Sequence, residues 1–474
     1  MTKKPNELTI VEAARALRAR ELTVRGLWDA CAEAARAKNP ELNAFLELFS
    51  ADEAAIAEAQ KRIDAGDAPL LCGIPLAIKD NILIEGHIAS AASKMLEHYR
   101  ATYDATVIKK LKAQGALFLG RANMDEFAMG SSTEHSAFGP TKNPHDVSRV
   151  PGGTSGGSAA AVAAHLCIAA LGTDTGGSVR QPAALCGVVG MKSTYGGVSR
   201  NGAIAMGSSL DQISPLAKTV EDARIVYEAI RGEDPLDSTT IPDGQYPARE
   251  VSERMRIGIP RRLLDEGLDP GVRAAFDVAL AKLQEAGHTL VDIELPLSGN
   301  ALPIYYVIMP AEVSANLARF DGIRYGHAPR GKTLLDDYIL SRTEGFGEET
   351  RRRVLLGTFV LSSGYIDAYY RKALAARAVL RREYDAAFQK VDAIAVPTTL
   401  APAFRFGEKS DPIVMYLEDI FTVTANLTGM PAISVPMGTV EREGKQLPVG
   451  IHFTAPHQAE EILFTIGTAV ENFR

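Results

Sequence analysis

The sequence predicts an α/β fold in which a large mixed sheet is flanked by helices on both faces. Short apolar runs typical of buried strands alternate with helical segments along the chain, which is the pattern of α/β proteins. Of the 474 residues, 46% are hydrophobic and 23% are charged, a balance that supplies a substantial core. Strand-like segments continue close to the end of the chain, so the later residues can complete the same sheet.

The first half of the chain supplies the predicted centre of the sheet. Thr9-Ile-Val-Glu12 is a capping-box pattern that opens a helix. The apolar run 71–78 predicts a buried strand with Lys79 at its end. Residues 130–157 are rich in Ser, Thr, Gly, Pro and Asn, and so long an irregular segment is usually functional. Helices are expected at 9–20, 23–38, 51–65, 104–114, 158–165 and 219–231, and strands at 71–78, 116–120 and 167–171.

The second half follows an exposed linker-like stretch at 235–250. We interpret the chain as one domain, 1–474, because its later strands can join the earlier ones. The expected parts are a helical segment at about 1–66, a core at about 70–232, and a remainder, 251–474, that completes the sheet and the substrate pocket. Strands are expected at 256–259, 288–295, 393–396, 432–435 and 449–453, and helices at 272–286, 302–319, 367–388 and the end of the chain.

Charge and cysteine usage narrow the functional class. A net charge of −7 argues against binding of a nucleic-acid backbone by this chain itself. No run of about 18 apolar residues and no apolar signal segment is evident, so we expect neither a membrane span nor export. Four widely spaced cysteines are typical of buried thiols in a reducing compartment, which favours the cytoplasm, and they offer no metal-site spacing.

The residues suited to catalysis are a serine behind two glycines and a lysine at a strand end. Ser178 closes the turn Thr173–Ser178, where it can act as a nucleophile. The backbone N–H groups of Thr175, Gly176, Gly177 and Ser178 are the candidate oxyanion donors, since glycines allow close approach to an oxygen. Lys79 can act as the base if burial lowers its pKa from about 10.4.

Thr154 is the candidate proton relay between this lysine and this serine, because its hydroxyl lies in the loop Gly-Gly-Thr-Ser-Gly-Gly-Ser, residues 152–158. The same glycines could instead cradle a phosphate at the start of the next helix. That alternative is disfavoured because no Gly-Lys-Ser/Thr ending follows them. Each element alone also fits an ordinary turn or a solvated charge, and the set of three is what favours amide cleavage.

These motifs resemble the amidase signature family, and within it the A subunits of glutamyl-tRNA(Gln)/aspartyl-tRNA(Asn) amidotransferases. The resemblance covers essentially the whole chain. It implies an amidase-signature fold, a glutaminase activity, and catalytic roles for Lys79, Thr154 and Ser178. It also implies that Tyr306, Arg353 and Asp419 hold free glutamine. The motifs are Arg149–Ala164, Gly172–Pro182, Met124–Ser132, Ser209–Gln212, Ala318–Gly326 and Glu344–Glu349.

The resemblance also implies partners. Ammonia from glutamine would pass to an amidotransferase assembly with B and C subunits, in which a partner holds the tRNA, ATP and magnesium. This chain itself is expected to need no cofactor and no metal, and to bind neither nucleic acid nor a membrane directly.

Several positions depart from the pattern of these A subunits. Thr154 stands where the family has a bridging serine, which keeps the hydroxyl and adds a methyl group that restricts χ1. Other departures are Ser193, Gly197, Asn201, His135 and His165. They keep open a stand-alone amidase that acts on small or oligomeric amides. A non-enzymatic scaffold is disfavoured because the lysine, the serine and the glycine turn are all present.

Overall fold

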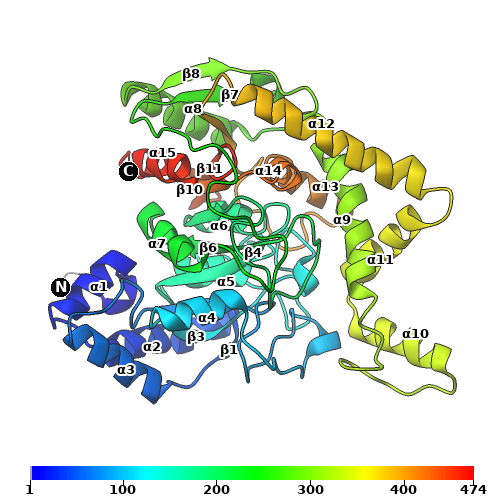
Figure 1. The fold of residues 1–474 in the computed structure, drawn as a ribbon, viewed down its shortest axis with the longest axis horizontal. Helices are drawn as coiled ribbons and strands as arrows, with labels where there is room; N and C mark the ends of the chain where they lie inside the picture. Colours follow the sequence, from blue (N-terminus) through cyan, green and yellow to red (C-terminus); the bar gives the residue numbers. More distant parts are fainter. Residues whose placement is uncertain (1–2, 266, 474) are drawn as a thin grey trace.

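The computed structural model describes residues 3–265 and 267–473, and its centre is one mixed sheet (Figure 1). The sheet has 11 strands in the order β1-β3-β2-β4-β6-β5-β10-β11-β9-β7-β8. This confirms the predicted α/β fold with a large mixed sheet. The strands are β1 (Phe45–Leu48), β2 (Pro75–Lys79), β3 (Leu117–Ala122), β4 (Ala169–Asp174), β5 (Val189–Lys192), β6 (Gln212–Ala217), β7 (Arg256–Ile259), β8 (Thr289–Asp292), β9 (Ala393–Pro397), β10 (Ala432–Arg442) and β11 (Lys445–Thr454).

Helices flank this sheet and pack onto its strands (Figure 1). α5 contacts β2 and β4, and α6 and α15 both contact β10. The α-helices are α1 (Ile10–Arg18), α2 (Val24–Leu42), α3 (Glu53–Asp64), α4 (Thr106–Ala113), α5 (Gly156–Ala163), α6 (Arg180–Cys186), α7 (Val220–Ile230), α8 (Pro270–Glu285), α9 (Ala301–Leu317), α10 (Leu334–Gly345), α11 (Glu348–Leu361), α12 (Arg371–Ala387), α13 (Pro412–Tyr416), α14 (Val423–Thr428) and α15 (Glu460–Glu471).

Strand directions explain where the candidate site forms. β2 runs parallel to both β3 and β4, so the carboxyl ends of these strands lie at one edge of the sheet. Lys79 ends β2, and the Gly-Gly-Ser turn begins directly after β4. Loops at this edge of parallel strands are where α/β proteins commonly place their ligand sites. The sheet therefore brings two sequence-distant motifs to the same place.

Strands from both halves of the chain belong to the same sheet. β10 pairs antiparallel with β5, which joins the strands after residue 250 to those before it. Residues 235–250, between the halves, carry no helix or strand. The single domain and its subdivision into a helical segment, a core and a completing remainder stay predictions.

Local sequence signals located several elements correctly. The Thr9 side chain accepts a hydrogen bond from Glu12 N, and the Glu12 carboxylate accepts one from Thr9 N. The predicted capping box is therefore present at α1. The strand predicted at 256–259 matches β7. The strand predicted at 167–171 is shifted, because β4 spans 169–174 and leads directly into the turn.

Other elements had no clear signal in the sequence. β6 contains Pro215, a residue that normally argues against a strand inside a sheet. On one side Pro215 pairs with Leu171 of β4, and on the other side β5 pairs with β6 only at Leu216 and Ala217, so no residue of β5 is paired with the proline. β1, β5 and α6 are too short to show a clear hydrophobic period in the sequence. α10, α13 and α14 also lack a strong periodic pattern. No helix of the described residues is long and apolar enough to cross a membrane.

Candidate active site

Lys79 lies at the end of β2 and is fully buried among hydroxyl groups. Its Nζ is 2.8 Å from Thr154 Oγ1, 2.9 Å from Ser155 Oγ and 2.9 Å from Thr173 Oγ1. It also lies 3.3 Å from the Thr173 carbonyl oxygen. The structure thus brings together the predicted base and the predicted relay, which are 75 residues apart in the sequence. The hydroxyls of Ser155 and Thr173 were not predicted as part of this group.

Burial sets the charge of this lysine. Removal from water disfavours the ammonium form and lowers the pKa of Lys79 to about 7. The nearby carboxylates of Asp125, Asp174 and Asp211 act in the opposite direction and prevent a larger decrease. A substantial fraction of the lysine is therefore neutral near pH 7, as a general base requires.

The loop that carries Thr154 packs against a buried acid, Asp125, whose backbone N–H donates to the Thr154 carbonyl at 3.3 Å. Asp125 accepts hydrogen bonds from the backbone N–H groups of Thr133 and His135, at 2.8 Å and 3.0 Å. A Cβ at Gly153 would lie 2.3 Å from Asp125 Oδ2, so this position has no room for a side chain. The peptide bond between Gly153 and Thr154 is cis. His135 contributes its backbone N–H to this arrangement.

Ser178 lies in the turn after β4 and is 8% exposed. Its carbonyl accepts a hydrogen bond from Ser155 N at 3.0 Å, which ties the turn to the loop of Thr154. The Asp174 carboxylate accepts from Gly177 N at 3.0 Å and from Val179 N at 3.2 Å. The prediction that Gly177 donates to an oxyanion needs correction, because its N–H points to Asp174 instead.

Thr175, Gly176 and Ser178 are left as the candidate oxyanion donors. The turn has no room for larger residues, since a Cβ on Gly176 would lie 2.7 Å from Tyr305 Oη. Thr422 Oγ1 donates to the Gly176 carbonyl at 2.6 Å and so fixes the orientation of that peptide unit. The glycine turn is therefore positioned by α9, which carries Tyr305, and by the segment before α14, which carries Thr422.

A fully buried ion pair between Asp174 and Arg180 supports the glycine turn. Arg180 Nη2 donates to Asp174 Oδ1 at 2.8 Å and to Asn426 Oδ1 at 2.6 Å. Arg180 Nη1 lies 2.8 Å from His452 Nε2, and burial together with this guanidinium lowers the pKa of His452 well below its usual value. The imidazole is therefore neutral and accepts from Arg180. Asp174 and Arg180 were not predicted as part of the site. Both lie within the motif Gly172–Pro182, where two charged residues among glycines and small side chains could have indicated a buried ion pair.

Tyr306 and Arg353, two of the predicted glutamine ligands, are brought together. The Arg353 guanidinium lies over the Tyr306 ring, 5.5 Å from its centroid, and 5.3 Å from that of Tyr416. Arg353 is buried, and its Nε donates to Glu349 Oε1 at 2.7 Å. Tyr416 Oη donates to the same carboxylate oxygen at 3.0 Å. Glu349 and Tyr416 were not predicted, although the spacing of four residues between Glu349 and Arg353 on a helix was a signal.

Asp419, the third predicted ligand, belongs to the same charged region. Burial raises the pKa of its carboxyl to about 7, against the hydrogen bond from Ser131 and the charge of Arg353. Ser131 Oγ donates to Asp419 Oδ2 at 2.9 Å. Thr422 N donates to the Asp419 carbonyl at 3.0 Å, so Asp419 is linked to the residue that orients the glycine turn. The roles of Tyr306, Arg353 and Asp419 as glutamine ligands stay predictions.

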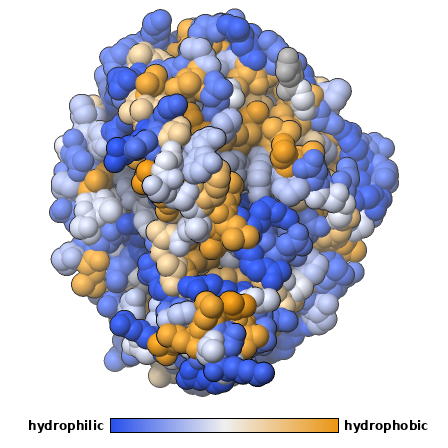
Figure 2. Space-filling model, turned by 90° about the vertical axis from the view of Figure 1, so that its right-hand side faces the viewer, coloured by the Kyte–Doolittle hydropathy of each residue, from blue (hydrophilic) through white to orange (hydrophobic). Residues whose placement is uncertain are grey.

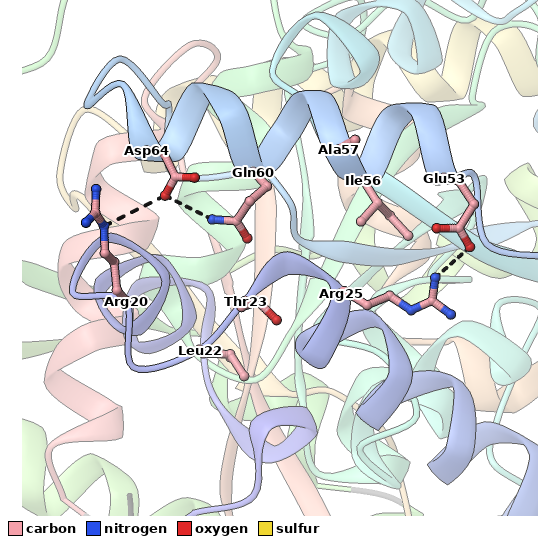
Figure 3. Close-up of a pocket in the computed structure, with 9 residues that line it drawn as sticks. All are labelled: Arg20, Leu22, Thr23, Arg25, Glu53, Ile56, Ala57, Gln60 and Asp64. Atoms are coloured by element: carbon pink, nitrogen blue, oxygen red, sulfur yellow. Dashed lines mark hydrogen bonds and ion pairs between the residues drawn. The ribbon is translucent and has the colours of Figure 1, made fainter.

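A cavity of about 750 Å³ elsewhere has no comparable chemistry. It lies between α3 and the segment that joins α1 to α2, with Arg20 and Asp64 at one end and Arg25 and Glu53 at the other (Figure 3). Ile56 and Leu22 line it between these ion pairs. Among residues 3–265 and 267–473, no group of three or more His, Cys, Asp or Glu side chains is arranged to hold a metal ion.

Comparisons with known proteins agree with the resemblance inferred from the motifs. The family model described as Amidase matches residues 27–464. The chain is 49% identical over 478 residues to the A subunit of glutamyl-tRNA(Gln) amidotransferase from Koribacter versatilis, with 98% of each chain covered. The crystal structure of the A subunit of glutamyl-tRNA(Gln) amidotransferase from Thermotoga maritima matches with a TM-score of 0.81 and 41% identity, over 99% of this chain and 95% of that one. Native peptide amidase from Stenotrophomonas maltophilia matches with a TM-score of 0.82 and 30% identity, over 98% and 97%.

Proposed function

The chain belongs to the amidase family, and we propose that it is a glutaminase subunit that releases ammonia from the side-chain amide of glutamine. The ammonia would serve the amidation of Glu-tRNA(Gln) or Asp-tRNA(Asn). The observation that carries this proposal is the buried amine of Lys79, 2.8 Å from the Thr154 hydroxyl and at the same sheet edge as the Ser178 turn. A low-pKa amine, a relay hydroxyl and a serine beside backbone donors form a complete set for amide hydrolysis.

Acylation begins with proton transfer. Neutral Lys79 takes the hydroxyl proton of Thr154, which takes that of Ser178, and Ser178 Oγ bonds to the amide carbon. The carbonyl electrons move to oxygen, where the N–H groups of Thr175, Gly176 and Ser178 stabilise the negative charge. The carbon–nitrogen bond then breaks as Lys79 returns its proton through Thr154 to the leaving nitrogen. Ammonia and a glutamyl ester of Ser178 result.

Deacylation uses the same groups with water as the nucleophile. Lys79 and Thr154 take a proton from the water, whose oxygen bonds to the ester carbon. The ester bond breaks, Ser178 recovers a proton, and glutamate is released. Enzymes that form a covalent intermediate commonly use the same base in acylation and in deacylation.

The charged region around Arg353 supports glutamine as the amide. Free glutamine carries an α-carboxylate, which a guanidinium can pair with in two parallel hydrogen bonds, and an α-ammonium, which a carboxylate can accept. Arg353 and Asp419 offer these two groups, with the half-buried ring of Tyr306 against the guanidinium. The Tyr306 hydroxyl has no hydrogen-bond partner within the described part of the chain. A substrate group can satisfy it.

Exposed apolar side chains support assembly with partner subunits. The outer side of the α11 region displays Leu355, which is 70% exposed, and Phe359, and α13 displays Ile413, which is 69% exposed. Apolar side chains also gather at the lower end of this face, where α10 carries Leu335 (Figure 2). Large exposed apolar patches mark interaction sites. We propose that amidotransferase B and C subunits cover this face and that a partner holds ATP, magnesium and the tRNA.

The thiols support a reducing compartment. Cys31, Cys72, Cys167 and Cys186 are all free and buried. Burial raises the pKa of Cys31 to about 12, so this thiol is protonated and unreactive at neutral pH. Unpaired buried cysteines are typical of proteins that never meet an oxidising environment. We propose a cytoplasmic location on this basis.

The test is a substrate comparison with the purified chain, alone and with B and C subunits added. We expect glutamine hydrolysis that rises when the partners are present, and its loss in Ser178→Ala. A serine-directed fluorophosphonate probe should label the parent protein and leave Ser178→Ala unlabelled. Efficient turnover of simple aliphatic or aryl amides with neglect of glutamine would favour the stand-alone amidase. No labelling and no turnover of any amide would overturn the enzymatic proposal.

A further inference from the structure

Three of the motifs that carry the family resemblance meet at the start of α11. The ring of Phe127 packs against that of Phe346, with centroids 5.6 Å apart, and against that of Phe320, at 4.9 Å. These rings come from the motifs at 124–132, 344–349 and 318–326. The helix that begins here carries Arg353 on its buried side. The three motifs thus converge on the helix that presents the proposed ligand of the glutamine carboxylate.

Glu126, which precedes Phe127, is buried at the N-terminus of α11. Its Oε2 accepts from Gly347 N at 2.7 Å and from Thr350 Oγ1 at 2.5 Å. Its Oε1 accepts from Ser93 Oγ at 2.5 Å. Burial raises the pKa of this carboxyl, and the three hydrogen bonds oppose that rise because they favour the charged form. A buried carboxylate therefore ties the start of α11 to the loop after β3.

Glu126 takes the place of a side-chain cap on α11. Gly347 is the N-cap and has no side chain, and Glu349 in the first turn is engaged with Arg353. In a capping box, a glutamate at the third helical position accepts from the N–H group of the N-cap residue. Here the third position is Thr350, and Glu126 receives that N–H group from 221 residues away. The first turn of the helix is thus fixed by a residue outside it.

Arg353 lies between two points at which α11 is held. It follows Thr350 by three residues, and both side chains belong to the buried side of the helix. Beyond it, Gly357 lies so close to the Pro310 carbonyl of α9 that no Cβ fits between them. If Glu126 is lost, the contact with α9 remains and the start of the helix is released. The guanidinium then loses its fixed position.

We propose that Glu126 is a positioning residue for glutamine, which fixes the first turn of α11 and thereby the Arg353 guanidinium that pairs with the α-carboxylate. This inference rests on the proposed function. In the described part of the chain, no hydrogen bond joins α11 to Lys79, Thr154 or Ser178. Loss of Glu126 should therefore weaken the binding of glutamine and leave the chemical step intact.

The experiment compares glutamine with propionamide, which has no α-carboxylate, as substrates of the parent, Glu126→Leu, Thr350→Val and the double variant. We expect Glu126→Leu to raise KM for glutamine at least about tenfold, since two parallel hydrogen bonds tolerate little displacement. Turnover of propionamide and the rate of fluorophosphonate labelling of Ser178 should change less than about twofold. The double variant should raise KM no further than Glu126→Leu alone, because Thr350 then has no carboxylate to bond.

Three outcomes would overturn the inference. An unchanged KM for glutamine in Glu126→Leu would show that the first turn of α11 does not need the carboxylate to place Arg353. Additive effects in the double variant would show that the two side chains do not act through their shared contact. Equal losses on glutamine and propionamide would show that Glu126 acts on the chemical step through its neighbour Asp125, whose N–H group donates to the Thr154 carbonyl at 3.3 Å.

Further variants control for folding and for the type of substitution. Glu126→Gln keeps an oxygen that can accept from Gly347 and Thr350, so its KM should stay nearer to that of the parent. Gly347→Ala disturbs the contact from the helix side, because a Cβ there would lie 2.7 Å from Glu126 Oε2. If Glu126→Leu does not fold, Gly347→Ala and Thr350→Val carry the test. Each should raise KM for glutamine at least about threefold and spare propionamide, and no rise in either overturns the inference. Thr465→Val, which removes a hydroxyl bonded to the Glu461 carbonyl of α15 at 2.8 Å, should behave as the parent.

Failure of this inference is distinct from failure of the proposed function. If the parent protein does not hydrolyse glutamine, the proposed function fails. If Arg353→Lys raises KM for glutamine while Glu126→Leu leaves it unchanged, the guanidinium binds the carboxylate without help from Glu126. Only this inference is then lost.

Discussion

The Asp174 carboxylate and the Arg180 guanidinium form an ion pair at 2.8 Å in which neither side chain reaches solvent. Burial alone would raise the pKa of Asp174, but the charge and hydrogen bonds of Arg180 hold it well below its usual range. The same carboxylate receives the backbone N–H groups of Gly177 and Val179 on either side of Ser178. The pair therefore connects the stability of the fold to the shape of the glycine turn.

Asp174→Ala should destabilise the protein strongly, because it leaves the Arg180 charge buried and unpaired. Breaking a buried pair by removal of one partner typically costs about 3–5 kcal/mol of unfolding free energy, which a denaturant titration followed by circular dichroism measures. Asp29→Ala, which removes one of the two exposed partners of Arg25, is the control and should hardly move the midpoint. A similar midpoint for both variants would contradict the supporting role of the buried pair.

Thr154→Val should lower kcat by about 10²–10⁴-fold, the usual contribution of proton transfer by a positioned group. Thr154→Ser keeps the hydroxyl 2.8 Å from Lys79 and should preserve or raise the rate. Steady-state kinetics on glutamine at saturating concentration separates the two variants. A large loss in the serine variant would show that the methyl group of Thr154 is needed, and the relay would have to be revised.

The pH dependence of kcat/KM should reflect two groups that lose protons near neutrality. Lys79 must be neutral to act as a base, and Asp419 must be charged to hold an ammonium group, and both have a pKa of about 7. Activity is therefore present above pH 7 and is lost as the pH falls through it. With both groups titrating, kcat/KM should fall by more than about tenfold per pH unit at low pH.

Asp419→Asn provides the check on that profile. The amide cannot titrate, so the fall at low pH should become shallower, with one group left, while KM for glutamine rises. An unchanged slope would remove Asp419 from the binding of glutamine. Simple aliphatic amides, which carry no α-ammonium, should show the shallow profile in the parent protein as well.

Arg353→Lys should raise KM for glutamine at least about tenfold, since an ammonium cannot form two parallel hydrogen bonds with a carboxylate. The substitution keeps a positive charge beside Glu349, whose carboxylate accepts from Arg353 at 2.7 Å, so the fold should hold. The matching measurement is turnover of propionamide, which has no α-carboxylate and should respond little. Equal losses on both amides would indicate a structural role for Arg353 and not substrate recognition.

Leu355→Glu should weaken assembly with B and C subunits and leave the isolated chain as stable as before, because this side chain is 70% exposed. Size-exclusion chromatography of the mixed subunits measures assembly, and thermal unfolding of the chain alone measures stability. Val278→Glu on α8, where the parent side chain is 54% exposed, is the control on another face. If Leu355→Glu leaves assembly unaffected, the partner subunits bind a different surface of this chain.

Local patterns predicted those parts of the fold that depend on neighbouring residues. The capping box at Thr9 and the strand at 256–259 need no information from distant segments, and both are present. β6 could not be predicted in the same way, since Pro215 pairs with β4 on one side and is acceptable there only because β5, on the other side, ends its pairing before it. Likewise, the loss of Gly177 as an oxyanion donor depends on the direction of the Asp174 carboxylate.

The sequence by itself determined the identity of the reactive groups: the amine of Lys79, the hydroxyls of Thr154 and Ser178, and a turn with the glycines that close approach requires. Tertiary structure alone decided the order of hydrogen bonds among them. Lys79 and Thr173 are 94 residues apart, and they meet because β2 and β4 lie side by side in the sheet. The same burial that removes water from this contact also lowers the pKa of Lys79, and no local pattern of residues contains that information.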